Sequence, residues 1–271
     1  MKHPTLAELD SLLLPLLHET LESRGTTEWS LKRDGSQVTQ LDHALQQVII
    51  GILQQLTPEY PVLGEEMDAE EQSHIFEDAT TPFWVLDPLD GTGNYVAGIP
   101  YFCTALALIE NREARLGWVY DPNRRERFAA VRGEGAWLGE QRLHPAPAPP
   151  MEQQTVQADL KRLPEALRLA FAQKPPYRSQ RNFGASALEW CWLAAGRGHF
   201  YLHGRQQLWD YAAGQLILRE AGGHGCQLNG EPLEPLALGT RSVLAGLDAT
   251  AHAEWWEWLK PYLADSTRKR N

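Results

Sequence analysis

The sequence is poor in cysteine. Its 271 residues include three cysteines, Cys103, Cys191 and Cys226, which are far apart and form no Cys-x-x-Cys pair. An odd number at such spacing argues against a disulfide framework and against a zinc ribbon. Each cysteine lies among apolar residues, so we expect buried free thiols in a reducing cytoplasm.

Long apolar runs and surplus positive charge are absent too. The leucine cluster at residues 12–17 is too short to span a bilayer, and no small-residue cleavage site follows it. We expect an amphipathic helix there, bent at Pro15. The net charge of −10 opposes binding to nucleic acid or to an anionic membrane, because both are negatively charged. It fits a protein that gathers carboxylates around cations, although solubility alone would explain it as well.

The remaining composition is that of a folded protein, with 43% hydrophobic and 22% charged residues. The chain is long enough to bury a substantial core as one domain or two lobes. A proline-rich stretch at residues 145–150 is the clearest internal boundary, because it cannot join a helix or a central strand. We predict an N-terminal α+β half at 1–145 and a C-terminal α/β half at 151–271, packed as one compact unit.

Hydrophobic periodicity predicts mixed α and β structure in both halves. In the first half, Thr39-x-x-Asp42 resembles a capping box that starts a helix ending near Pro58. A buried strand at 83–86 runs into Asp87, and antiparallel strands follow at 102–109, 116–120 and 127–131. In the second half we expect strands at 155–158, 200–202 and 243–245, and helices at 164–172, 185–195, 209–220 and 253–263.

The most informative segment is Asp87-Pro88-Leu89-Asp90-Gly91-Thr92. Its two carboxylates can face one hard cation, and the Leu89 carbonyl can add a ligand. Oxygen ligands suit magnesium, manganese or calcium rather than zinc. The N–H groups of Gly91 and Thr92, at the expected helix start, could hold phosphate. An ordinary strand-to-turn connection would also use Asp, Pro and Gly.

Three other acidic segments indicate a metal site only in combination with this one. Glu65 and Glu66 follow Gly64 in what would otherwise be a solvated acidic loop. Asp210 stands at a helix start, where an aspartate is usually an N-cap. Small residues follow it, so another element can approach closely. Asp42 alone would be the acid of its capping box.

Together these segments resemble the inositol monophosphatase family, within the superfamily that includes fructose-1,6-bisphosphatase. The resemblance covers nearly the whole chain and includes Gly117-x-x-Tyr120-Asp121-Pro122, Arg132-Gly133-x-Gly135-Ala136 and Glu220-Ala221-Gly222-Gly223. It implies a layered α-β-α-β-α sandwich and a magnesium-dependent phosphoric monoester hydrolase with two or three ions, for which Mn²⁺ could substitute. A homodimer is also implied.

The resemblance further implies roles for individual residues. The first metal would be held by Glu65, Asp87 and the Leu89 carbonyl, and the second by Asp87, Asp90 and Asp210. Thr92 would orient the attacking water, with Asp42 positioning its hydroxyl and Glu66 assisting near a weaker third metal. Phosphate and substrate would meet Asp90, Gly91, Thr92, Gly184, Ser186 and His203.

The resemblance implies the phosphatase class and leaves more than one substrate open. We expect hydrolysis of inositol monophosphate or a related sugar or polyol phosphate by metal-activated water. Inositol-hydrolysing members place a glutamate ahead of Asp210, but residues 202–208 here contain no acid. His203 and Arg205 would suit a more anionic substrate, or are simply solvated. Lys32-x-Asp34-x-Ser36 equally resembles 3′(2′),5′-bisphosphate nucleotidases, which act on adenosine 3′,5′-bisphosphate. A scaffold or regulatory role, as in RNA-related assemblies, is the third hypothesis.

Overall fold

A computed structural model describes residues 3–22, 29–31, 37–78 and 81–268. The Lys32-x-Asp34-x-Ser36 pattern lies outside the described residues. Helices and strands are mixed along the chain, from α1 (Leu6–Glu22) to α8 (Ala249–Arg268). None of the helices in the described ranges is both long enough and apolar enough to cross a lipid bilayer.

The first half is built on a seven-stranded sheet. Its order is β3-β4-β5-β6-β7-β8-β9, antiparallel except for the parallel pair β3–β4. The strands are β3 (Val62–Gly64), β4 (Phe83–Asp90), β5 (Cys103–Glu110), β6 (Glu113–Asp121), β7 (Glu126–Val131), β8 (Gly135–Leu138) and β9 (Gln141–Arg142). Helix α1 and helix α2 (Gln40–Leu56) cover one face of this sheet. A small ribbon of β1 (Trp29–Leu31) and β2 (Gln37–Thr39) precedes α2.

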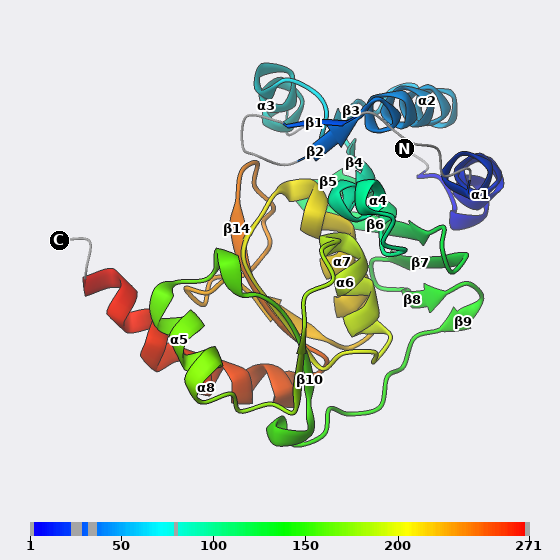
Figure 1. The fold of residues 1–271 in the computed structure, drawn as a ribbon. Helices are drawn as coiled ribbons and strands as arrows, with labels where there is room; N and C mark the ends of the chain where they lie inside the picture. Colours follow the sequence, from blue (N-terminus) through cyan, green and yellow to red (C-terminus); the bar gives the residue numbers. More distant parts are fainter. Residues whose placement is uncertain (1–2, 23–28, 32–36, 79–80, 269–271) are drawn as a thin grey trace.

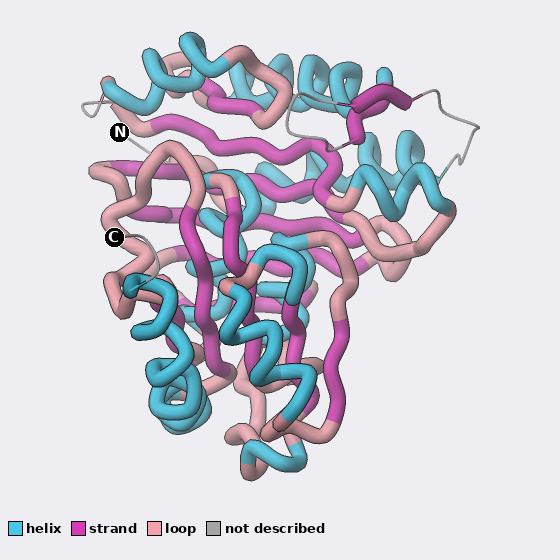
Figure 2. The backbone as a smooth tube through the Cα atoms, turned by 60° about the vertical axis from the view of Figure 1, so that its left-hand side comes forward, coloured by secondary structure: helices cyan, strands magenta, loops and turns pink. Residues whose placement is uncertain are grey.

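The second half is built on a five-stranded mixed sheet in the order β11-β10-β12-β14-β13. The strands are β10 (Thr155–Asp159), β11 (Ser179–Arg181), β12 (Phe200–Gln206), β13 (His224–Cys226) and β14 (Arg241–Gly246). Helices α5 (Glu165–Gln173) and α8 pack on its outer face. In Figure 2 the strands of the two sheets run in clearly different directions.

Helices α6 (Ser186–Ala194) and α7 (Leu208–Glu220) lie between the two sheets (Figure 1). Their side chains Trp190, Tyr211 and Leu216 are fully buried in a core that also takes residues from both sheets. Full burial of such a side chain contributes about 1.5–3 kcal/mol. The order helix, sheet, helix, sheet, helix confirms the predicted layered sandwich. The division of the chain at residues 145–150 stays a prediction.

Local rules account for several element boundaries. The capping box is confirmed: the Thr39 side chain accepts N–H groups at the start of α2, and Asp42 accepts the Thr39 N–H. Helix α3 (Ala69–Glu77) follows the Glu65-Glu66 loop, and Asp68 caps this helix while Phe76 is buried beneath it. Cys226 is partly exposed, so the expectation of three buried thiols is wrong for this cysteine.

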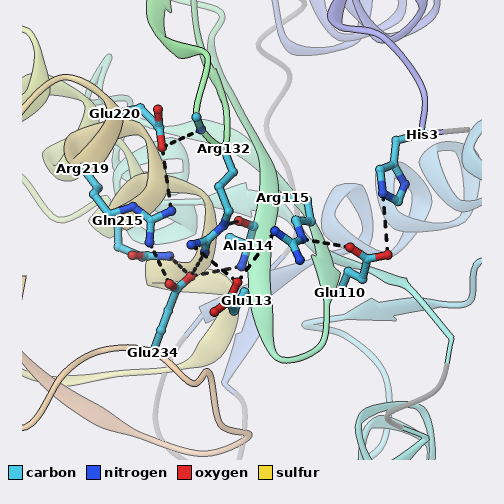
Figure 3. A network of polar contacts seen from close by, with 11 residues as sticks. His3, Glu110, Glu113, Ala114, Arg115, Arg132, Gln215, Arg219, Glu220 and Glu234 are labelled. Carbon is cyan, nitrogen blue, oxygen red and sulfur yellow. Dashed lines mark hydrogen bonds and ion pairs between the residues drawn. The ribbon is translucent and has the colours of Figure 1, made fainter.

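A charged network joins the two halves at the edge of α7 (Figure 3). The Glu234 carboxylate accepts hydrogen bonds from Arg132 at 2.5 Å, from Arg219 at 2.7 Å, from Gln215 at 3.0 Å and from the Ala114 N–H at 3.1 Å. Burial alone would raise the pKa of Glu234, but these hydrogen bonds and the two arginine charges outweigh burial and lower it. The carboxylate therefore stabilises the fold while it is ionised.

The variant Glu234→Gln should lose about 2 kcal/mol of unfolding free energy at neutral pH, because two arginines lose their charged acceptor. Since the folded-state pKa is lowered, the contribution is present above the ordinary value of 4.5 and is lost as pH falls through the folded-state value. Urea unfolding at neutral and at acid pH measures both effects.

The control is Glu113→Gln, because Glu113 meets Arg132 only at 3.6 Å and its side chain is 42% exposed. It should change stability by less than about 1 kcal/mol. Equal losses in the two variants, or a Glu234→Gln loss that does not shrink in acid, would contradict the assigned role.

Candidate metal centre

An open cleft of about 350 Å³ gathers most of the predicted site residues. Its wall is formed by elements of both halves, from β4 and α4 (Thr92–Ala97) to β12 and α7. Ten of the predicted residues line it: Glu65, Asp87, Leu89, Asp90, Gly91, Thr92, Gly184, Ser186, His203 and Asp210. Asp42 and Glu66 are not part of the wall.

Three carboxylates meet in this cleft. Asp87 and Asp90 end β4, and Asp210 lies in the first turn of α7. Each offers an oxygen within 4.8 Å of the others. Residues three apart in a regular strand point to opposite faces, but the pairing of β4 with β5 shifts register between Asp87 and Asp90. This irregularity allows both side chains to reach the same side.

A backbone N–H group holds each of the three carboxylates. Asp87 accepts the Leu89 N–H at 3.1 Å. Asp90 accepts the Ala187 N–H at 2.7 Å, at the start of α6. Asp210 accepts the Gln207 N–H at 2.7 Å, as the third helical residue of a capping box and not as the N-cap. These bonds fix the acids without neutralising them.

Burial and mutual repulsion act on these acids. Burial raises the pKa of Asp87 well above its ordinary value, and the charges of Glu65, Asp90 and Asp210 raise it further. Burial also raises the pKa of Asp90, to about 7, although the Ala187 N–H offsets part of the effect. Buried like charges are costly unless a cation compensates them. The donors are all oxygen, so the set fits a hard divalent cation such as Mg²⁺ rather than zinc.

Thr92 is fixed by Asp42 behind the cleft wall. The Thr92 hydroxyl lies 2.8 Å from Asp42 Oδ1 and 3.0 Å from the Leu89 carbonyl oxygen. Asp42 is buried, and its Oδ2 accepts both the N–H and the hydroxyl of Thr39. The capping box of α2 therefore sets the carboxylate that holds Thr92, so one aspartate serves both functions.

Gly91 forms the turn between β4 and α4. Its φ of 91° lies in the left-handed region that favours glycine. A Cβ at this position would lie 3.0 Å from the Ala185 Cβ and 3.1 Å from the Tyr101 carbonyl oxygen. Glycine thus lets the first turn of α4 approach the segment before α6, where Gly184 and Ser186 line the same cleft.

Glu66 stands apart from the other predicted acids. Its N–H donates to Gln46 Oε1 at 2.9 Å, which ties this loop to α2. A Cβ on Gly64 would lie 2.2 Å from the same Gln46 oxygen, so glycine is required for this approach. The contact positions the loop that carries Glu65, whose side chain is hydrogen-bonded to Asp87.

Several residues of the cleft wall were not predicted from the sequence. Glu189 lies in the apolar helix α6, where burial raises its pKa to about 8. The sequence signal that could have identified Glu189 is its position as the single carboxylate of an otherwise apolar helix. No sequence pattern distinguishes four further residues of the cleft wall, which are Asp159, Arg162, Asn182 and Thr240. His203 does line the cleft, but its Nδ1 accepts the Arg205 N–H and its Nε2 lies 3.4 Å from Asp159.

Comparison with known proteins shows the same family throughout. The profile of the inositol monophosphatase family matches residues 11–267. Nus factor SuhB of Pasteurella multocida is 35% identical over 214 residues, covering 77% of this chain and 78% of the relative. Inositol-1-monophosphatase of Bacillus subtilis is 33% identical over 213 residues, with coverage of 77% and 78%.

Solved structures agree with this result. An IMPase of Thermotoga maritima superposes with a TM-score of 0.81 at 26% identity, covering 96% of this chain and 99% of that one. SaIMPase-II with bound inositol monophosphate has a TM-score of 0.80 at 26% identity, with coverage of 97% and 96%. The fold is therefore shared over nearly the full length of each chain.

The carboxylate cluster predicts opposite stability effects of Asp87→Asn with and without metal. Without metal, at neutral pH, the variant should gain about 1 kcal/mol, because one of several repelling buried acids is removed. With excess Mg²⁺ it should be less stable than the original protein, because a bound ligand stabilises the folded state by an amount that grows with the logarithm of its affinity. Thermal unfolding in chelator and in Mg²⁺ measures both.

The matched control is Asp159→Asn in the same cleft. Asp159 is paired with Arg162 and His203, so its removal should give no gain without metal and leave the Mg²⁺ response intact. If Mg²⁺ stabilises Asp87→Asn as strongly as the original protein, the cluster does not bind the metal.

Proposed function

The chain belongs to the inositol monophosphatase family, as its motifs predicted, and we propose that it is a Mg²⁺-dependent hydrolase of small phosphate monoesters that uses water as the nucleophile. The phosphatase class follows from the family. The observation that carries the proposal is the convergence of Asp87, Asp90 and Asp210 beside Thr92 in one cleft.

The proposed ligands follow from the cleft wall. Glu65, Asp87 and the Leu89 carbonyl would hold one ion, and Asp87, Asp90 and Asp210 a second. Bound Mg²⁺ would neutralise phosphate charge and make water more acidic. Two or three ions are compatible with the acids present, and Mn²⁺ offers the same preference for oxygen. The N–H groups of Gly91 and Thr92 would hold phosphate oxygens.

Thr92 and Asp42 would orient the nucleophile. The Thr92 hydroxyl has one hydrogen, and Asp42 Oδ1 at 2.8 Å is its charged acceptor. Its oxygen then accepts a hydrogen from water, which turns the water oxygen toward phosphorus. As the new P–O bond forms, the ester P–O bond breaks, and one proton of the attacking water ends on the leaving alkoxide, so that the products are inorganic phosphate and an alcohol. No nucleophilic side chain is required.

We propose inositol monophosphate or a related sugar or polyol phosphate as substrate. Support comes from the relative called inositol-1-monophosphatase and from SaIMPase-II, which was solved with inositol monophosphate. The alternative is a 3′(2′),5′-bisphosphate nucleotidase. The absence of an acid at residues 202–208 supports this alternative. We also propose that the protein is cytoplasmic and that it forms a homodimer. Light scattering would test the homodimer.

A second role is suggested by the relatives called Nus factor SuhB, which include that of Pasteurella multocida. Such a role would place this chain in a macromolecular assembly through its surface. The complete set of cleft carboxylates supports catalysis as the main activity. A protein that is folded but inactive toward every phosphate ester would favour the assembly role instead.

Phosphate release from inositol 1-phosphate, several sugar phosphates and adenosine 3′,5′-bisphosphate tests the proposed activity. We expect turnover of at least one compound with Mg²⁺ and none in chelator. Asp87→Asn and Asp210→Asn should each reduce kcat/KM by about a hundredfold or more, because each removes a charged ligand. If both variants remain fully active, the site is wrong.

The Thr92→Ala variant should lower kcat by about a hundredfold, because the water loses the acceptor that orients it. Thr92→Ser keeps the hydroxyl and should retain activity to within about tenfold. KM and Mg²⁺-dependent stability should change little in both. Equal activities of the alanine and serine variants would show that the hydroxyl does not orient the water.

A further inference from the structure

Two arginines form a cationic part of the cleft wall. Arg162 ends the short helix η2 (Leu160–Arg162), and Arg205 lies near the end of β12. Both line the cleft that holds the acidic cluster. Arg205 is exposed, and within the described residues its guanidinium has no hydrogen-bond or ion-pair partner. A charged fork therefore faces the cleft without a protein acceptor.

The backbone locks these two arginine segments together. A Cβ at Gly204 would lie 1.7 Å from the Arg162 carbonyl oxygen, so only glycine permits this contact. Next to it, Asp159 pairs with His203 in the parallel register of β10 and β12. The His203 ring is held on both sides, by the Arg205 N–H and by Asp159. The position of Arg205 beside Arg162 is thus built into the fold.

The local charge is unbalanced. Asp159 is the carboxylate among these residues, and it is shared between Arg162 at 3.8 Å and His203 at 3.4 Å. Glu189, elsewhere on the wall, accepts the Phe183 N–H at 3.0 Å. The remaining wall acids belong to the metal cluster. Positive charge at Arg162 and Arg205 therefore exceeds the negative charge beside it.

A guanidinium is a donor only and pairs best with phosphate or carboxylate, often through two parallel hydrogen bonds. A neutral polyol gives it no such partner. The reactive phosphate is already provided for by the metal cluster and by the first turn of α4. The arginines therefore have the chemistry to bind a different anionic group of the same molecule.

We propose that Arg162 and Arg205 form a subsite for a second phosphate group, so that the preferred substrate is a small phosphate monoester with a further phosphate. This inference rests on the proposed phosphatase function and narrows its substrate class. His203 is a positioning residue, because both ring nitrogens already contact the protein. The second phosphate could belong to a polyol or to a nucleoside, since the arginines recognise the anion.

The test compares substrates that differ by one phosphate. One pair is inositol 1-phosphate and inositol 1,4-bisphosphate, and the other is adenosine 3′-phosphate and adenosine 3′,5′-bisphosphate. In at least one pair the bisphosphate should have kcat/KM higher by about tenfold or more, the value of a charge-assisted contact. The pair with the larger ratio identifies the polyol or nucleoside source.

The variant Arg205→Gln should lower the bisphosphate-to-monophosphate ratio by about tenfold. Arg162→Gln should lower it less, because Arg162 also faces Asp159. The matched control is Arg168→Gln, an exposed arginine on α5 that does not line the cleft, and it should leave the ratio unchanged. High salt should reduce the ratio in the original protein by screening the contact.

The outcomes separate the subsite from the proposed function. Turnover of monophosphates with equal ratios in the original protein and Arg205→Gln would overturn the subsite and leave the phosphatase function standing. If no compound is hydrolysed, the proposed function fails, and calorimetric binding of the same pairs decides the subsite. The subsite is supported if the original protein binds the bisphosphate more tightly than the monophosphate and Arg205→Gln removes this preference. The subsite is overturned if the original protein binds both compounds of each pair equally.

Discussion

The arrangement of the cleft depends on holding three mutually repelling carboxylates within 4.8 Å of one another. Asp87, Asp90 and Asp210 come from two distant parts of the chain, and each is held by a backbone N–H group. Side-chain partners would compete with a metal for charge, whereas an amide donor restrains one carboxylate oxygen and leaves the charge in place. Because Asp90 of the first half accepts the Ala187 N–H of the second half, the geometry of the cluster depends on how the two halves pack together.

Close backbone approaches make this docking possible. A Cβ on Gly117 of β6 would lie 2.7 Å from the Ala213 carbonyl oxygen, and one on Gly214 would lie 2.3 Å from the Trp190 Cβ. Helix α7 therefore sits against both the large sheet and α6 at its first turns, close to Asp210. At its other end, Glu220 accepts the N–H groups of Gly133 and Gly135. Motifs that are far apart in the sequence therefore contact one another along α7.

The layered fold and the main acids could be predicted from sequence because their signals are local or belong to the family. Thr39-x-x-Asp42 is a capping box in sequence and in structure, and Asp87 follows a buried strand as expected. The register shift that brings Asp90 beside Asp87 has no comparable signal. Arg162 and Glu189 were also not predicted from the sequence, because their position in the cleft depends on how η2 and α6 pack. The roles assigned to the site residues remain proposals from geometry and family resemblance.

The separation of metal ligands from the cationic wall has a chemical consequence. The carboxylates lie on β4 and α7, whereas Arg162 and Arg205 lie on η2 and β12 and meet through Gly204. An arginine at position 205 favours an anionic group of the substrate over a hydroxyl, and Arg205 is not one of the residues whose N–H groups hold the cluster. We therefore expect a substitution at Arg205 to change the preference of the cleft wall between hydroxyl and phosphate while the three carboxylates stay in place. The loop ahead of Asp210 therefore carries both Arg205, which lines the cleft, and Gln207, whose N–H holds the Asp210 carboxylate.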